Sequence, residues 1–212
     1  MSYSHEEQEQ IAQLRDYWSR WGNHISIAVL VVALGFAGFF GWQWWQRSRA
    51  ANAAVVFEQV QSAIQSNSAD RIKQAWADMQ TKAPSSTYAG MAALAVAKAL
   101  HDAGQNDAAV AALQWAAANA VGSSERAVAR LNLSALQIDA RQYAQAASTL
   151  ADNPEPAFAP LFDLRRGDLA ALQGQRDAAR KAYQAALKAL PAGAPERQAI
   201  EQRLQAVGGA AA

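Results

Sequence analysis

The sequence predicts an all-α protein in which one apolar helix precedes a solenoid of antiparallel helix pairs. Three observations carry this prediction: an uncharged run of 21 residues lies near the N-terminus, the period-two patterns of strands are absent after residue 50, and short segments rich in Gly, Pro, Asn and Ser interrupt helical windows. The chain is 51% hydrophobic, which excludes wholesale disorder, but much of this fraction is alanine, which favours helix more than it fills a core.

The uncharged run, residues 25–45, reads ISIAVLVVALGFAGFFGWQWW. At a rise of 1.5 Å per residue it forms a helix about 31 Å long, which matches the roughly 30 Å hydrocarbon core of a bilayer. Tryptophans bracket the run and arginines follow it, as at membrane interfaces. The sequence therefore predicts a transmembrane helix at 25–45 with these interface residues: Trp18, Trp21, Trp42, Trp44, Trp45, Arg47 and Arg49.

A cleaved signal peptide is the main alternative to an anchor, because Ala51, Asn52 and Ala53 form an A-x-A sequence. The run is longer than the usual apolar region of roughly 7 to 15 residues, and the segment before it is net acidic. Arg47 and Arg49 also lie between the run and the A-x-A sequence. These features favour a permanent anchor over a soluble protein released after Ala53.

The orientation of the span does not follow from charge. Arg15 and Arg20 precede it, and Arg47 and Arg49 follow it, so the positive-inside count is a tie.

Two further features flank or line the span. Residues 1–24 predict an amphipathic helix, with Ile11, Leu14, Trp18 and Trp21 on one face, that ends near Gly22 and Asn23 and either seats the anchor or docks a membrane partner. Within the span, three glycines three residues apart form a candidate helix-packing stripe: Gly35, Gly38 and Gly41.

The region after residue 50 divides into short helices. Breaks are expected at 66–70, 82–87, 103–107, 121–125, 152–156 and 191–195, where Gly, Pro, Asn and Ser cluster. We expect juxtamembrane helices over 46–89, repeats with a capping helix over 90–207, and a flexible tail over 208–212.

Internal repetition marks the region 90–207. GQNDAA begins at Gly104, GQRDAA begins at Gly174, and ARQYAQAA around Tyr143 lies between them in the same role. The small residue that follows falls at Ala109, Ala146 and Ala179. Their spacings of 37 and 33 residues suit a repeat of about 34 residues built from a helix pair.

The last unit has the fullest pattern. Counted from Pro160, small, aromatic and proline residues occupy the positions that they hold in tetratricopeptide repeats: Gly167, Ala179, Tyr183, Ala186 and Pro191. We expect Gly167 and Ala179 to allow close helix approach, Tyr183 to fill the adjoining gap, and Pro191 to end the second helix. The earlier units lack the tryptophan and glycine of the first helix.

Nothing in the sequence indicates catalysis. His5, His24 and His101 lie in different segments, the chain has no cysteine, and no nucleophile elbow, phosphate loop or dinucleotide motif occurs. Past Arg49, 15 Lys/Arg balance 14 Asp/Glu, so nucleic acid is not an expected partner. We therefore expect neither an enzyme nor a bound cofactor or metal.

Residues 3–60 carry a resemblance to a known family. The segments EEQEQIAQLRDYW, WGN, GWQWWQ and VFEQV, with Gly35 in the span, resemble the start of the YfgM-like proteins, ancillary subunits of the bacterial Sec translocon. The resemblance implies an inner-membrane protein with a cytoplasmic N-terminus and a periplasmic tetratricopeptide-like domain. It also implies SecYEG and a membrane-anchored periplasmic chaperone of the PpiD type as partners.

The expected function is a membrane-anchored interaction scaffold at the translocon, which assists transfer of translocated proteins to periplasmic chaperones. The alternative is an adaptor in envelope or outer-membrane biogenesis or cell-wall assembly, without a tie to Sec. If the first helices of the repeats line a concave groove, the candidate contact residues are Met91, Leu94, Lys98, His101, Leu161 and Asp168. The same reasoning adds Leu131 and Ile138 to the groove candidates, and packing between helices is the competing interpretation for Leu94, Leu131 and Ile138.

Overall fold

The structure, a computed structural model, describes the backbone of residues 5–153 and 155–209. Before residue 29 it describes the side chains of residues 15, 18, 23, 26 and 27 alone. The predicted apolar face of the first segment, with Ile11, Leu14 and Trp21, therefore lies outside the described side chains, as do residues 210–212 of the predicted tail. The chain divides into two units, residues 1–50 and 51–212.

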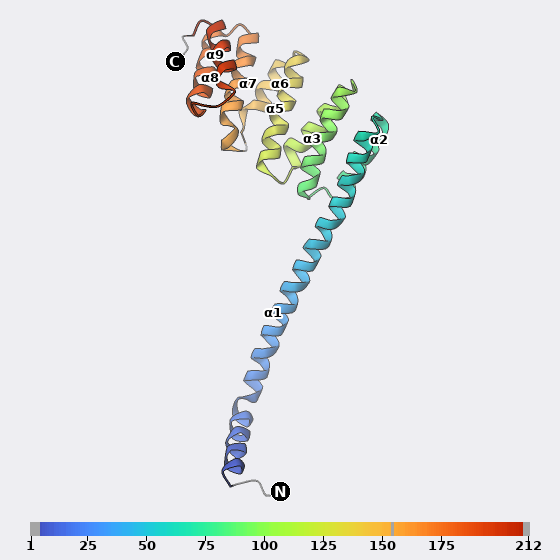
Figure 1. Cartoon of the computed structure of the whole chain (residues 1–212), viewed down its shortest axis with the longest axis vertical. Coiled ribbons are helices and arrows are strands. Elements are labelled where there is room, and N and C mark those ends of the chain that lie inside the picture. Colours follow the sequence, from blue (N-terminus) through green and yellow to red (C-terminus); the bar gives the residue numbers. More distant parts are fainter. Residues whose placement is uncertain (1–4, 154, 210–212) are drawn as a thin grey trace. The chain divides into compact units, whose positions relative to one another are not determined.

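Every regular element within these described ranges is helical, which confirms the predicted all-α class (Figure 1). Helix α1 (His5–Gln65) is the longest. It continues through Gly22 and Asn23, so the predicted helix end at these residues is wrong. Glycine in a helix interior costs only about 1 kcal/mol, and no proline is present in α1 to interrupt its hydrogen bonds.

The first unit exposes apolar side chains all along its uncharged run. The side chains described as exposed include Ile27, Val29, Leu30, Val31, Val32, Leu34, Phe36, Phe39, Phe40, Trp42, Trp44 and Trp45. A Cβ atom added at Gly35, Gly38 or Gly41 would meet nothing within 4 Å, so the glycine stripe contacts no other described part of the chain. Among the residues that the structure describes, no helix combines the length and hydropathy needed to cross a membrane.

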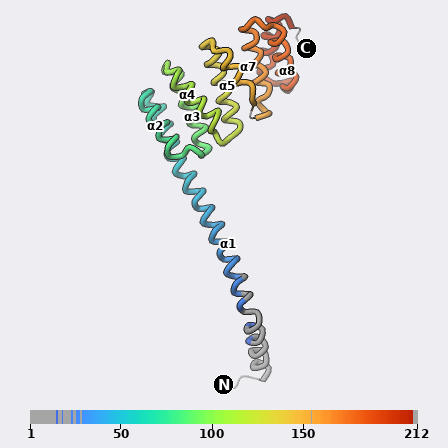
Figure 2. The backbone as a smooth tube through the Cα atoms, turned by 180° about the vertical axis from the view of Figure 1, so that it is seen from behind, coloured from blue at the N-terminus to red at the C-terminus, as the bar shows by residue number. Residues whose placement is uncertain are grey.

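The second unit begins with the end of α1 and continues as consecutive antiparallel helices (Figure 2). These are α2 (Ala69–Lys82), α3 (Thr87–Asp102), α4 (Asn106–Asn119), α5 (Ser123–Asp139), α6 (Tyr143–Ala151), η1 (Pro156–Phe158), α7 (Ala159–Leu172), α8 (Arg176–Ala189) and α9 (Arg197–Ala206). Each of the six predicted breaks includes a gap between helices or overlaps one. Two further boundaries lie outside the predicted breaks: α5–α6, just before Tyr143, and α7–α8, just after Leu172.

Three hairpins in this unit close through the same turn. Gly104, Arg141 and Gly174 all have positive φ, at 74°, 58° and 73°. The residue after each of them donates its backbone N–H to a carbonyl five residues earlier, as in the Schellman motif that ends many helices. The recurrent geometry makes α3–α4, α5–α6 and α7–α8 successive copies of one structural unit.

Alanine allows the helices of each copy to approach closely. Ala109, Ala146 and Ala179 each follow the turn by five residues and are fully buried. The core is divided along the chain: one cluster includes the end of α1 and α2 to α5, a second includes α5 to α7, and a third includes α7 to α9. Each repeat therefore shares its core with its neighbours, as expected for a solenoid.

Candidate interaction site

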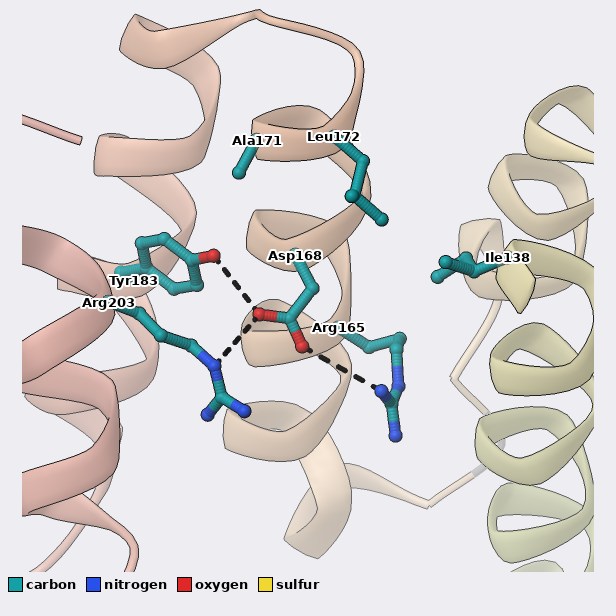
Figure 3. A pocket seen from close by; sticks show the side chains of 7 residues that line it. All are labelled: Ile138, Arg165, Asp168, Ala171, Leu172, Tyr183 and Arg203. Atoms are coloured by element: carbon teal, nitrogen blue, oxygen red, sulfur yellow. Dashed lines mark hydrogen bonds and ion pairs between the residues drawn. The ribbon is translucent and has the colours of Figure 1, made fainter. Parts of the chain in front are cut away.

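A depression of about 440 Å³ lies in the second unit, between the last hairpin and its neighbours (Figure 3). Its apolar lining comes from Ile138 on α5, from Ala171 and Leu172 on α7, and from Tyr183 on α8. Its charged lining consists of Arg165 and Asp168 on α7 and Arg203 on α9. The depression therefore combines an aliphatic surface with a concentration of charge.

Close packing of α7 on α8 fixes one wall of the depression. A Cβ atom built on Gly167 would lie 2.5 Å from Cε1 of Tyr183, which no side chain tolerates. The ring of Tyr183 is buried because Gly167 leaves room for it. Gly167 thus holds the phenol hydroxyl beside Asp168, the next residue on α7.

Asp168 joins three helices through its carboxylate. Tyr183 Oη donates a hydrogen bond of 3.0 Å to Oδ1, and Arg203 Nε lies 3.3 Å from the same oxygen. Arg165 Nη1 lies 3.7 Å from Oδ2, and the Asp168 side chain is 18% exposed. The capping helix α9 is thereby tied to the last hairpin by a partly desolvated ion pair.

The hydroxyl of Tyr183 is a permanent donor in this network. Burial raises the pKa of Tyr183 far above its ordinary value of 10, and the negative charge of Asp168 raises it further. The nearby positive charge of Arg203 opposes these effects but does not cancel them. Tyr183 therefore stays protonated at physiological pH.

Of the candidate groove residues, Asp168 and Ile138 line this depression. Met91 and Lys98 are exposed on α3, where Lys98 pairs with Asp102, and Nδ1 of exposed His101 donates a hydrogen bond to Oδ1 of Asn106. Leu94 and Leu161 are half-buried and pack against the first and second core clusters. The candidate side chains therefore do not gather in one pocket of the described region.

The expected repeat positions lie at the helix contacts. Ala186 is fully buried with Tyr183 in the third cluster, and Tyr143 is half-buried against the second. Pro191 is exposed directly after Leu190, the residue that caps α8. At the predicted interface, Trp18, Trp42, Trp44, Trp45 and Arg47 are exposed, and the guanidinium of Arg49 lies 4.0 Å from the centroid of the Trp45 ring.

Sequence reasoning missed Arg165 and Arg203. The spacing of Arg165 and Asp168, three residues apart on one helix, is a usable signal for an ion pair. Arg203 lies 35 residues from Asp168 on another helix, and no periodicity links them. Among the described residues, no three His, Cys, Asp or Glu side chains are arranged to hold a metal ion.

Successive helix hairpins with alanine at each close approach, and with tyrosine packed against glycine in the last one, define a tetratricopeptide-like helical repeat protein. The match to a family model agrees with this class. A family model described as a tetratricopeptide repeat-like domain matches residues 15–209. Curated relatives named ancillary SecYEG translocon subunit also match most of the chain. One from Haemophilus influenzae is 32% identical over 188 residues, which cover 88% of this chain and 91% of the relative.

A second relative with the same name, from Neisseria gonorrhoeae, is 27% identical and covers 95% of this chain and 97% of its own length. One from Escherichia coli is 24% identical and covers 86% of this chain and 87% of its own length. The chain therefore belongs to the YfgM-like family of ancillary SecYEG translocon subunits, in agreement with the resemblance of residues 3–60.

Proposed function

We propose that this protein is a membrane-anchored interaction scaffold at the Sec translocon. One observation carries the proposal: a single chain combines an uncharged run of 21 residues with a helical repeat domain, within a family whose curated relatives are named translocon subunits. Helical repeats present extended surfaces for protein partners. The proposed role is therefore binding, with no chemical step.

The proposed anchor is a transmembrane helix over residues 25–45. Its support is the exposure of apolar side chains along the run, because each large apolar side chain that leaves water contributes about 1.5–3 kcal/mol. Lipid would remove all these side chains from water at once. The tryptophans and arginines after the run suit the lipid–water boundary.

For topology, we propose a cytoplasmic N-terminus and a periplasmic repeat domain in the bacterial inner membrane. The balanced arginines on the two sides do not favour either orientation, so this part of the proposal depends on family membership. In that orientation Trp42, Trp44 and Trp45 lie at the periplasmic face. The alternative orientation would place the repeats in the cytoplasm, away from periplasmic chaperones.

The proposed partners are SecYEG and a membrane-anchored periplasmic chaperone of the PpiD type. An anchored scaffold replaces a search in three dimensions with one in the plane of the membrane, which raises the effective concentration of the partner. Transfer of emerging proteins to periplasmic chaperones then depends on the repeats holding a chaperone beside the channel. The adaptor role in envelope biogenesis without Sec remains the competing outcome.

Native-membrane affinity purification with mass spectrometry tests this function. The full chain is compared with a truncated variant in which a cleavable periplasmic export signal replaces residues 1–48, and a single-pass protein with an unrelated periplasmic domain is the control. We expect the full chain to enrich channel subunits and a chaperone, and the truncated variant to retain the chaperone alone. Enrichment of envelope-assembly proteins without channel subunits would support the alternative and contradict the proposal.

A photo-crosslinking experiment separates the surfaces of the repeat domain. A crosslinking amino acid is placed at Leu172, which lines the depression, or at Lys98, an exposed residue of α3. Exposed Lys188 on α8 outside the depression is the control position. Adducts with one defined envelope protein from Leu172 or Lys98 would support a docking surface, whereas the same adduct pattern from all three positions would contradict it.

A further inference from the structure

The charge of the second unit is unevenly distributed, although its total is nearly neutral. From residue 159 to residue 207 the chain has eight Lys/Arg against five Asp/Glu, whereas residues 51–158 have seven against nine. The last hairpin and its capping helix are therefore the positive part of the repeat domain. The depression lies in this part.

The depression itself has the same imbalance at close range. Arg165 and Arg203 both face the single carboxylate of Asp168, at 3.7 and 3.3 Å. Within the residues that the structure describes, neither guanidinium donates a hydrogen bond to another protein group, although each has five N–H donors. The guanidinium groups of Arg165 and Arg203 therefore share the carboxylate of Asp168, and their remaining N–H donors face solvent.

Next to these charges lies an unusual apolar surface. Leu172 is 58% exposed, whereas the other large apolar side chains of α7 are buried or half-buried. Figure 3 shows Ala171 and Leu172 on one side of Asp168 and the two guanidinium groups on the other. A segment that crosses the depression would meet an aliphatic contact and a guanidinium pair in succession.

We propose that this depression binds an acidic segment of a partner protein, in which a carboxylate side chain contacts Arg165 and Arg203 and a neighbouring aliphatic side chain packs on Ile138 and Leu172. The inference deepens the proposed function, since it names the chemistry of a partner for the scaffold. Charge complementarity selects a carboxylate, and the planar guanidinium groups suit its two oxygens. The aliphatic patch makes an amphipathic acidic segment a better match than a purely polar one.

Asp168 acts in this arrangement as an internal competitor. It neutralises part of the charge of both arginines when the depression is empty, so an incoming carboxylate must share them with it. Removal of the arginines should therefore weaken binding of the acidic segment, and removal of the Asp168 charge should strengthen it. A purely structural ion-pair network predicts no such opposite signs.

The test uses the full chain in detergent micelles and a fluorescein-labelled peptide of twelve residues in which Glu and Leu alternate. Peptides with Lys in place of Glu, or Ser in place of Leu, are the controls for charge and for the aliphatic contact. Fluorescence anisotropy at two salt concentrations measures the dissociation constant. We expect the Glu/Leu peptide to bind more tightly than both controls, and more weakly at high salt.

Variants of this protein distinguish peptide binding in the depression from attraction to positive charge elsewhere on the repeat domain. Arg165→Gln combined with Arg203→Gln should weaken binding by about tenfold, the loss of charge-assisted hydrogen bonds at a partly exposed site. Arg176→Gln combined with Arg180→Gln removes the same charge from exposed or half-exposed positions on α8 outside the depression, and should change affinity less than about twofold. Asp168→Asn should tighten binding by a few fold, with folding checked by circular dichroism.

Three results would overturn the proposal: equal loss from both arginine pairs, weaker binding by the Asp168→Asn variant, or no preference for Glu/Leu over Ser-containing peptide. Water-soluble short-chain phosphatidylglycerol provides a separate arm, because the proposed anchor would carry the full chain into vesicles whether or not the depression binds lipid. If the Arg165/Arg203 variant loses binding of this lipid and keeps peptide binding, the site takes a lipid headgroup and the proposal is wrong. The translocon role is tested independently, because co-purification of channel subunits is measured with the depression intact.

Discussion

Gly167→Ala is the substitution that most directly tests how the last repeat is packed. The new Cβ atom would lie 2.5, 2.6 and 3.0 Å from Cε1, Cδ1 and Cζ of Tyr183. Ordinary carbon contacts lie near 3.5–4.0 Å, so the ring or the helix must move by about 1 Å. The ring cannot move freely because its hydroxyl is bonded to Asp168.

The expected cost follows from three contributions. Overpacking of this kind costs about 1–3 kcal/mol, and a stretched hydrogen bond between Tyr183 and Asp168 adds about 1 kcal/mol. Alanine recovers about 1 kcal/mol because it is the better helix former. The net loss in the free energy of unfolding is about 2 kcal/mol, or roughly 4–8 °C in melting temperature for a domain of this size.

Thermal unfolding of the full chain in detergent micelles, followed by far-ultraviolet circular dichroism, measures this loss. Gly90→Ala in α3 is the matched control, because its new Cβ atom makes a milder contact than the one at Gly167. The nearest atoms would be Cβ of Ala120 at 3.0 Å and Glu125 at 3.4 Å. We expect Gly90→Ala to change stability by less than about 1 kcal/mol, since a small shift relieves the contact.

A double-mutant cycle then attributes the effect to the ring. In the background of Tyr183→Leu, the Gly167→Ala change should cost much less than in the native chain, because the clashing atoms are gone. A Gly167→Ala variant as stable as the native protein, or equal costs in the two backgrounds, would show that the contact between Gly167 and the Tyr183 ring does not limit the packing of α7 on α8.

Three further predictions concern the same unit and the anchor. Arg141→Gly should stabilise the protein by about 0.5–1 kcal/mol, and Gly174→Ala should destabilise it by a similar amount, because both residues have positive φ. Chemical unfolding measures both changes, and equal effects of the two substitutions would contradict this prediction. The pKa of Tyr183 is raised in the folded state, so its protonated form contributes stability that is fully present below its ordinary pKa of 10 and is lost as pH rises above it. Tyr183→Phe should therefore flatten the alkaline fall in stability, and absorbance titration should show one late-titrating tyrosine fewer than in the native chain. Finally, the full chain should stay in the membrane after alkaline carbonate extraction, whereas a variant without residues 1–48 should be released; release of both would remove the support for an anchor.

The hairpins could be predicted from sequence because their signals are local. Gly104 and Gly174 end a helix, a fully buried alanine follows five residues later, and both features recur at a readable spacing. The left-handed conformation of Arg141 could not be predicted in this way. This residue takes the same left-handed turn without glycine, because the flanking hairpin contacts and the Schellman hydrogen bonds offset a backbone strain of about 1 kcal/mol.

The candidate groove could be predicted far less well. The candidate residues share a place on the first helices of the repeats, but exposure in a solenoid depends on which neighbour covers each face. Leu94 and Leu161 are partly covered by adjoining helices, whereas Leu172, which was not a candidate, is exposed beside Asp168. The decisive cation, Arg203, belongs to the capping helix, whose packing direction no repeat pattern specifies.

The ion-pair network around Asp168, at the C-terminal end of the solenoid, contains more charge than stability alone requires. Arg197 also anchors α9, because its Nη1 donates to the carbonyl oxygens of Leu187 and Leu190 at the end of α8, at 2.7 and 3.1 Å. The buried Ile200 and Leu204 and the Arg203–Asp168 pair complete the attachment of the cap. Arg165, the second cation on Asp168, lies on α7 itself and so adds nothing to that attachment. A surplus cation beside an exposed leucine is instead what a surface that recognises a carboxylate and an aliphatic side chain needs, and this is the physical reason to seek the partner of the scaffold at its C-terminal hairpin.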